Sequence, residues 1–267
     1  MTDVITSENT KYQFDRIDRY LCNSMNLPGY WEVREKCGAF SAEHLDEACP
    51  DEISCFFVEV GLQNHLAITS IAGAKEFSVL LRKLLLLNPP NPILVWEFFA
   101  CSLNALYKAC NGLMSFSFAM LFPESILDVS SIVSESGYNG IGIHNYLPGG
   151  IQVKDWFCSN YPKIQQNLLR CSNSHKYRHL DVHSWRNLIR LSKAREGLPW
   201  ELLVLSDPNL RPARVSGSDT AWKNGVLMLD EAIETHERCF EEIYHEIISV
   251  DATRDFLERY EIVLRST

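Results

Sequence analysis

The feature that most constrains the fold is an apolar repeat near the end of the sequence. Between residues 222 and 250, apolar side chains recur at alternating spacings of four and three, and His236 is the only polar member. Such heptad-like spacing places all of them on one face of a helix. We therefore predict a helix that Arg254 ends. We call its apolar face the seam. The seam either packs within its own domain or forms an assembly contact between chains. Its apolar residues are Trp222, Val226, Leu229, Ile233, Phe240, Ile243, Ile247 and Val250.

The rest of the chain is also predicted to be mainly helical. Apolar spacing predicts helices over residues 11–25, 73–87 and 93–122, and Pro123 suits the first turn of a further helix. The prolines of Asn88–Pro92 interrupt helical hydrogen bonding, and we expect a second interruption at Asn111-Gly112. Strand signals are poor throughout. The predicted fold class is all-α.

One segment lacks helical periodicity and suggests a domain boundary. Residues 136–150 contain five glycines and a proline, which favour irregular backbone. A short strand-like turn inside this segment is the alternative. We predict two helical-bundle domains joined by a Gly-rich linker: an N-terminal helical domain at 1–136, the linker at 137–150 and a C-terminal helical domain at 151–267.

Charge is segregated along the chain. The net charge is −9, but residues 151–200 carry 9 basic and 3 acidic side chains. Residues 1–150 carry 9 basic and 17 acidic ones, and residues 219–267 carry 5 and 12. Such asymmetry is typical of self-association or of a separate surface for a polyanion.

The basic centre includes a predicted helix, Tyr161–Arg195, followed by a short apolar piece, Trp200–Leu205. Spacings of four and three would place Arg186, Arg190 and Lys193 on one face of that helix. Lysine and arginine on one face bind phosphates without reading sequence, and the same face suits an anionic membrane. Pairing with the acidic C-terminal region is the alternative. The candidate polyanion-binding residues are Arg170, Lys176, Arg178, Arg186, Arg190, Lys193 and Arg195.

Evidence for catalysis is weak, because the sequence has no phosphate-binding loop, nucleophile elbow or zinc-protease helix. One group of possible metal ligands recurs every four residues: Cys171, His175, His179 and His183. A straight helix usually offers only two ligands to one ion, so a solvated histidine face is the alternative, and protonation could make it a pH switch. We predict a protein that is not an enzyme and has no cofactor, with zinc kept as an alternative.

The nine cysteines are an odd number without C-x-x-C spacing, which predicts reduced thiols in a cytosolic or nuclear protein. Met1–Thr10 is polar, so we expect no signal peptide. The longest uncharged apolar stretch, Ala109–Phe122, has 14 residues, fewer than the about 20 that a spanning helix needs.

Two segments resemble the matrix proteins of influenza-type viruses (orthomyxoviruses). The sequence Gly73-Ala74-Lys75-Glu76-Phe77-Ser78 resembles the start of a helix in that family, and residues 101–108 resemble its apolar helix. The order of the later features is also similar: an apolar helix, a linker and a Cys/His-containing stretch. The basic stretch that precedes the first segment in the family has no counterpart, since residues 61–72 contain no Lys or Arg. The chain looks like a distant, thogotovirus-type member.

This resemblance implies a two-domain, helical viral structural protein that self-assembles beneath the envelope and bridges membrane and ribonucleoprotein during assembly and budding. Its expected partners are further copies of itself in an open helical polymer, the viral ribonucleoprotein and, peripherally, an anionic membrane. The expected locations are the virion beneath the envelope, the host cytoplasm and nucleus, and the inner face of the host membrane. The alternative is a non-enzymatic adaptor or regulator that binds a host protein through the C-terminal heptad helix.

Overall fold

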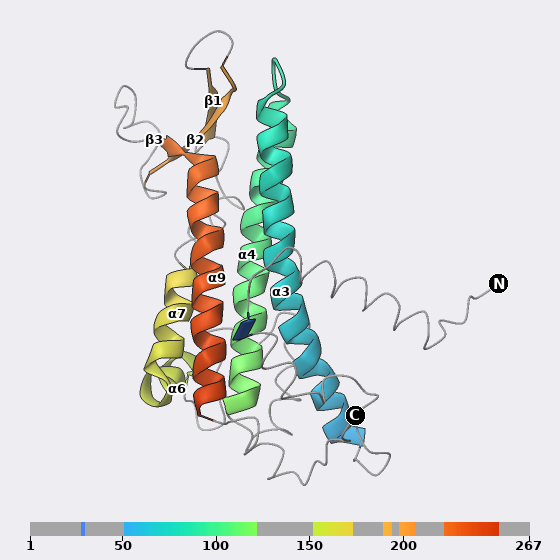
Figure 1. The fold of residues 1–267 in the computed structure, drawn as a ribbon, viewed down its shortest axis with the longest axis vertical. Helices are drawn as coiled ribbons and strands as arrows, with labels where there is room; N and C mark the ends of the chain where they lie inside the picture. Colours follow the sequence, from blue (N-terminus) through green and yellow to red (C-terminus); the bar gives the residue numbers. More distant parts are fainter. Residues whose placement is uncertain are drawn as a thin grey trace, which may run out of the picture.

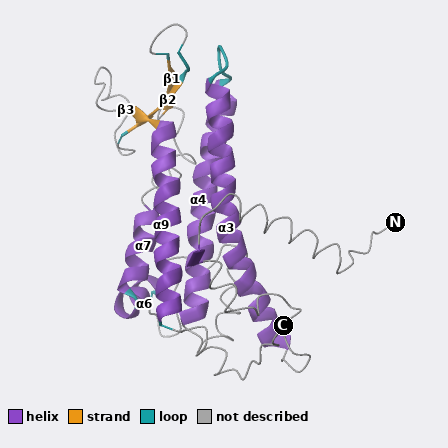
Figure 2. Ribbon diagram, viewed as in Figure 1, coloured by secondary structure: helices purple, strands orange, loops and turns teal. Residues whose placement is uncertain are grey.

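The structure, a computed structural model, describes residues 28–29, 51–121, 152–172, 189–193, 198–206 and 222–250. Most of these residues are helical, and three short strands form a small sheet (Figures 1 and 2). The elements, in chain order, are α3 (Asp51–Leu85), α4 (Pro92–Leu121), α6 (Val153–Asn160), α7 (Pro162–Ser172), β1 (Ile189–Ser192), β2 (Glu201–Leu205), β3 (Trp222–Asn224) and α9 (Gly225–Ser249).

Helices α3 and α4 form a long hairpin with a proline-rich turn (Figure 1). The predicted break at Asn88–Pro92 is confirmed, because α3 ends at Leu85 and α4 begins at Pro92. The side chain of Asn91 starts α4 by accepting hydrogen bonds from the backbone N–H groups of Ile93 (3.0 Å) and Leu94 (3.3 Å).

The predicted interruption at Asn111-Gly112 is wrong, since α4 runs through it. One glycine lowers helix propensity by only about 1 kcal/mol relative to alanine. Here Gly112 is buried, and its neighbours Cys110, Leu113 and Met114 are almost completely buried as well. Packing of this part of α4 outweighs that small local preference.

Helix α9 carries the predicted seam. Its face packs against α3 and α4 on one side and α7 on the other. The seam residues inside the helix are all buried: Val226, Leu229, Ile233, Phe240, Ile243 and Ile247. Packing within the chain therefore accounts for the heptad-like spacing, and an assembly role for these residues stays a prediction.

The predicted limits of this helix need correction. Trp222 lies in strand β3, and Val250 follows the last helical residue and is 37% exposed. The physical reason for the later start is the N-cap: Asn224 adopts an extended backbone, and its side chain accepts hydrogen bonds from the N–H groups of Val226 and Leu227. The helix therefore begins after Asn224.

The predicted helical fold class is confirmed in its main part, because the described part of the chain is mostly helical. It also includes a small antiparallel sheet in the order β1-β2-β3, which the sequence does not predict. Strand β1 lies inside the segment predicted as helix Tyr161–Arg195, and β2 is the apolar piece after it. Leu202 and Val204 are buried on one face of β2, and Val204 pairs with Ile189 and Lys223. Periodicity cannot distinguish such a short apolar run from a buried helical segment.

Residues from both predicted domains contribute to one hydrophobic core among the described residues. Phe99 and Leu106 of α4 belong to it, as do Phe157 of α6, Leu168 of α7 and Phe240 of α9. Helix α4 is long and apolar enough to cross a membrane, but 56% of its most apolar part is buried in this core. The predicted linker at 137–150 and the predicted helices at 11–25 and 123–135 lie outside the described residues, so the domain boundary stays a prediction.

Candidate functional site

The described members of the predicted basic centre divide into two groups. Arg170 lies in the last turn of α7, whereas Arg190 lies on β1 and Lys193 directly follows it. The other candidates, Lys176, Arg178, Arg186 and Arg195, lie outside the described residues. Arg190 and Lys193 are therefore not on a helix, and the predicted helical face with Arg186 is wrong. In an extended strand, alternate residues share a face, so spacings of four and three no longer bring side chains together.

Arg170 is neutralised within the molecule. Its Nη1 atom lies 3.6 Å from a carboxylate oxygen of Glu242 on α9 and donates to Asn167 Oδ1 at 3.1 Å. One turn further along α9, Glu246 accepts a hydrogen bond of 3.1 Å from Lys163 of α7. For Arg170, then, the structure shows the intramolecular pairing that was the alternative to polyanion binding.

Helix α9 also neutralises two cations of α3. Glu237 forms an ion pair with Lys75, and Asp230 forms one with Arg82. The side chain of Ser78, between those two cations on α3, donates a hydrogen bond to Asp230. Several acidic residues of the C-terminal region thus form ion pairs that join α9 to α3 and α7.

Arg190 is held by an aromatic ring. It is exposed, and its guanidinium carbon lies 3.8 Å from the centre of the Trp222 ring. Strand pairing explains this: Arg190 is opposite Leu203, which is opposite Asn224, so Arg190 and Trp222 share one face of the sheet. No carboxylate in the described segments pairs with Arg190. A cation–π contact fixes the guanidinium while leaving its charge uncompensated.

Lys193 joins the sheet to the α3–α4 turn. Its amine lies 5.8 Å from the centre of the Trp200 ring and donates a hydrogen bond of 3.4 Å to Asn88 Oδ1. The Trp200 indole N–H donates to the same oxygen at 3.4 Å, and the Trp200 backbone N–H donates to the Leu85 carbonyl at 3.0 Å. Lys193 likewise has no carboxylate partner among the residues described.

The same turn carries a group of exposed apolar side chains. Leu86 is 68% exposed, Leu87 52%, Ile93 69% and Leu94 43%. The turn and the sheet lie at one end of the bundle (Figure 1). We call this region the hairpin end and define it as Leu86, Leu87, Ile93 and Leu94 together with Lys83, Arg190, Lys193 and Trp200.

Among the described residues of the hairpin end and its adjoining elements, three cations face two nearby exposed carboxylates. Lys83 is exposed in the last turn of α3 and adds to the charges of Arg190 and Lys193. Among the described residues, Glu97 on α4 and Glu201 on β2 are the exposed carboxylates nearest to the hairpin end in the sequence. The region therefore combines exposed leucines with uncompensated positive charge.

The predicted metal group is not assembled in the described part of the chain. Cys171 is completely buried on α7, and the structure does not describe His175, His179 or His183. No group of three or more potential ligands occurs among the residues that it does describe. Cys171 therefore does not lie on a solvated face, because its position on the amphipathic α7 points it into the core.

Cys171 meets two other buried thiols, Cys110 of α4 and Cys239 of α9. Hydrogen bonding with Cys110 and Cys239, reinforced by burial, raises the pKa of Cys171 well above that of an ordinary thiol. The Cys171 side chain is accordingly protonated at neutral pH. Since the thiolate is the reactive and metal-binding form, this thiol acts as a small apolar core group.

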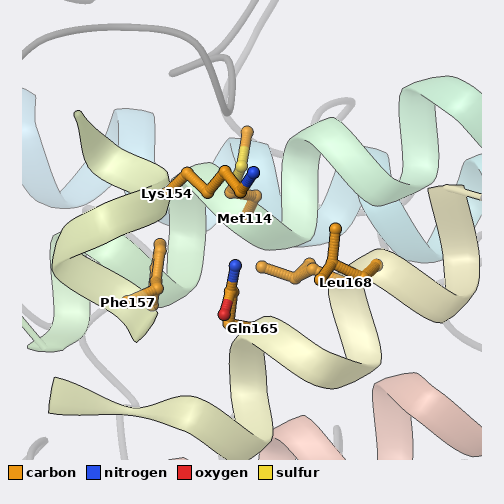
Figure 3. A pocket seen from close by; sticks show the side chains of 6 residues that line it. Met114, Lys154, Phe157, Gln165 and Leu168 are labelled. Atoms are coloured by element: carbon orange, nitrogen blue, oxygen red, sulfur yellow. The ribbon is translucent and has the colours of Figure 1, made fainter. Parts of the chain in front are cut away.

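A small hollow opens between α4, α6 and α7 (Figure 3). Its volume is about 10 Å³, the space of roughly one water molecule. Its lining is Met114, Lys154, Phe157, Gln165, Leu168 and Leu169. This hollow is too small for a substrate. The predictions that the protein is not an enzyme and has no cofactor stay predictions.

Comparison with protein-family models, with curated proteins and with solved structures finds no match to this chain.

Proposed function

We propose that this protein is a non-enzymatic structural protein of the viral matrix class. It self-assembles beneath the envelope and bridges an anionic membrane and the ribonucleoprotein during assembly and budding. It acts in the virion, the host cytoplasm and nucleus, and at the inner face of the host membrane. The observation that supports this proposal best is the state of Arg190 and Lys193, which are held beside tryptophan rings without a carboxylate partner among the described residues.

Such an arrangement suits contact with phosphate. An arginine or lysine already paired with a carboxylate must exchange one anion for another. Arg190 and Lys193 have no carboxylate partner among the described residues that a phosphate would have to displace. The ring contact with Arg190 also restricts the guanidinium, so less rotamer entropy is lost when it binds. Phosphate contacts of this kind carry no sequence information and weaken with salt.

The outward surface of α9 supports self-association. Glu231 and Glu234 are exposed there and form no ion pair with any residue that the structure describes. An acidic surface on one copy and the basic hairpin end of the next are complementary. Contacts between two different surfaces are heterologous, and they build open assemblies when the rotation does not close.

The test is binding of single-stranded RNA and of phosphatidylserine-containing vesicles by the full chain over a range of salt concentrations. The doubly substituted variant Arg190→Glu/Lys193→Glu should lose most of its binding to both ligands, and the wild-type binding should weaken as salt rises. The matched control is Lys108→Glu/Lys154→Glu, which makes the same change of charge at exposed positions of α4 and α6.

Full binding by the Arg190→Glu/Lys193→Glu variant would contradict the role of these two cations. A salt-insensitive monomer or closed dimer that binds neither ligand would contradict the proposed function as a whole. That second result would favour the adaptor alternative, although the heptad seam proposed for it is buried in the chain's own core.

A further inference from the structure

We propose that the hairpin end is a membrane-insertion site. The side chains of Leu86, Leu87, Ile93 and Leu94 enter the interfacial layer of an anionic bilayer, while Lys83, Arg190 and Lys193 contact the lipid headgroups. This inference rests on the proposed function and adds to it, because it identifies lipid as a polyanion that this site contacts and names the residues that enter the bilayer.

Exposure of the apolar side chains is the first argument. Leu86 and Ile93 are each more than two-thirds exposed, on either side of the same proline-rich turn. Leu87 and Leu94 stand beside them and are about half exposed. Contiguous exposed apolar side chains of this kind mark an interaction surface, whereas isolated ones are common on any protein. Transfer of such side chains from water to an apolar phase is favourable in proportion to the area that leaves water.

The turn is also held in place. Asn91 caps α4 through the N–H groups of Ile93 and Leu94, and Asn88 accepts hydrogen bonds from Lys193 and Trp200. On the α3 side of the turn, the Leu85 carbonyl accepts a hydrogen bond from the Trp200 backbone N–H. A turn fixed from both sides presents its leucines without a large ordering cost on binding.

The shape of the region favours lipid over other partners. Leu86 and Leu87 directly follow α3, and Ile93 and Leu94 lie in the first turn of α4. The turn that joins these two helices lies at one end of the bundle (Figure 1). A narrow convex tip fits between lipid molecules. Single-stranded RNA is bound by aromatic rings on which its bases stack, and the four exposed apolar side chains beside the turn include no aromatic ring.

An amphipathic ring and cations lie beside the exposed apolar side chains. The Trp200 indole and the Lys193 amine both reach Asn88 inside the turn, and Lys83 lies in the last turn of α3. Tryptophan prefers the headgroup level, and lysine is attracted to an anionic membrane surface. This charge complementarity is why we choose an anionic bilayer as the partner.

The experiment is co-sedimentation of the full chain with two kinds of vesicle, phosphatidylcholine alone and phosphatidylcholine mixed with phosphatidylserine. We expect the variant Leu86→Asn/Leu87→Asn to bind mixed vesicles at least about tenfold more weakly than wild type, with unchanged RNA binding. The control variant Leu66→Asn/Leu169→Asn alters two leucines that are each 41% exposed elsewhere on α3 and α7, and it should bind like wild type. Circular dichroism confirms that each variant is folded.

A second measurement reports insertion directly. In vesicles whose acyl chains carry bromine, the added tryptophan of a Leu87→Trp variant should lose fluorescence on binding, relative to wild type. The added tryptophan of a Leu66→Trp variant should not. Equal quenching of both, or of neither, would overturn insertion at the hairpin end.

The outcomes separate this inference from the proposed function. If Leu86→Asn/Leu87→Asn binds mixed vesicles as well as wild type, insertion is overturned while an electrostatic matrix role stands. If wild type binds RNA but no vesicles, insertion is likewise overturned and ribonucleoprotein is the polyanion. Loss of vesicle binding in Leu86→Asn/Leu87→Asn but not in Leu66→Asn/Leu169→Asn, with RNA binding retained, supports the inference.

Discussion

Basic and aromatic side chains have different partners at the two ends of the helical bundle. Where α7 packs against α9, Lys163 and Arg170 each meet a glutamate. Aromatic rings near that end, such as Trp156 and Phe157, pack against one another with ring centres 5.1 Å apart. At the hairpin end, Arg190 and Lys193 lie beside tryptophan rings instead of carboxylates, and leucines face the solvent.

This contrast distinguishes groups that hold the fold together from groups that are available to a partner. Ion pairs and packed rings at the α7–α9 contact are satisfied within the chain, so their loss is expected to affect stability. Exposed leucines and uncompensated cations contribute little to folding, so their loss is expected to affect binding.

The largest effect is expected in the α9 seam. Phe240→Ala removes a fully buried ring and should lower the free energy of unfolding by about 3–5 kcal/mol. The matched change Leu227→Ala, at a leucine of the same helix that is 59% exposed, should cost less than about 0.5 kcal/mol. Urea denaturation measures both. Similar losses for the two variants would show that the seam does not form the core.

A smaller but still clear difference is expected between cysteines. An ordinary cysteine thiol has a pKa of about 8.5. Because Cys171 is buried and its pKa is raised, it keeps its proton in the folded state at that pH. Its alkylation by iodoacetamide at pH 8 should be at least about tenfold slower than that of the exposed Cys158. Peptide mass spectrometry follows both sites, and urea should abolish the difference. Equal rates in the folded protein would contradict burial of the thiols.

A modest effect is expected at the α7–α9 ion pairs. Arg170→Gln removes a pair in which both side chains are 47% exposed, and solvent screening limits the loss to about 1 kcal/mol or less. Thermal unfolding measures this change, and binding to mixed vesicles should be unaltered. If Arg170→Gln reduced vesicle binding as strongly as Arg190→Gln, the division of the basic residues into paired and available groups would be wrong.

The smallest effect on stability is expected at the hairpin end. The variant Leu86→Asn/Leu87→Asn should unfold within about 0.5 kcal/mol of wild type, because both side chains already face water. Urea denaturation on the samples used for vesicle binding checks this. A loss of several kcal/mol would mean that these leucines are part of the fold and not of a contact surface.

Much of the helical framework could be predicted from the sequence. The proline-rich segment Asn88–Pro92 has a strong local effect on backbone geometry, and it does separate α3 from α4. The seam of α9 was predictable because seven-residue spacing, sustained over several turns, is typical of a helix with one apolar face. Both signals are local, so they do not depend on what the segment packs against.

The sheet and the hairpin end depend on tertiary contacts and were harder to predict. Ile189–Ser192 has no strand signal of its own and becomes a strand by pairing with Glu201–Leu205. The sequence shows that Arg190 belongs to a basic segment, but only strand register brings it to Trp222. The exposed leucines were missed although a signal existed: Leu84–Leu87 is an apolar run too long for one helical face, and it continues into a proline turn.

The most direct test of membrane contact by the hairpin end is co-sedimentation of the full chain with phosphatidylserine-containing vesicles at rising salt. The samples are wild type, Leu86→Asn/Leu87→Asn and Arg190→Glu/Lys193→Glu. We expect that wild type binds, that salt weakens this binding, and that both variants stay largely in the supernatant while remaining folded. Binding of both variants at the wild-type level, or no binding by wild type at low salt, would contradict the claim that the hairpin end meets an anionic membrane.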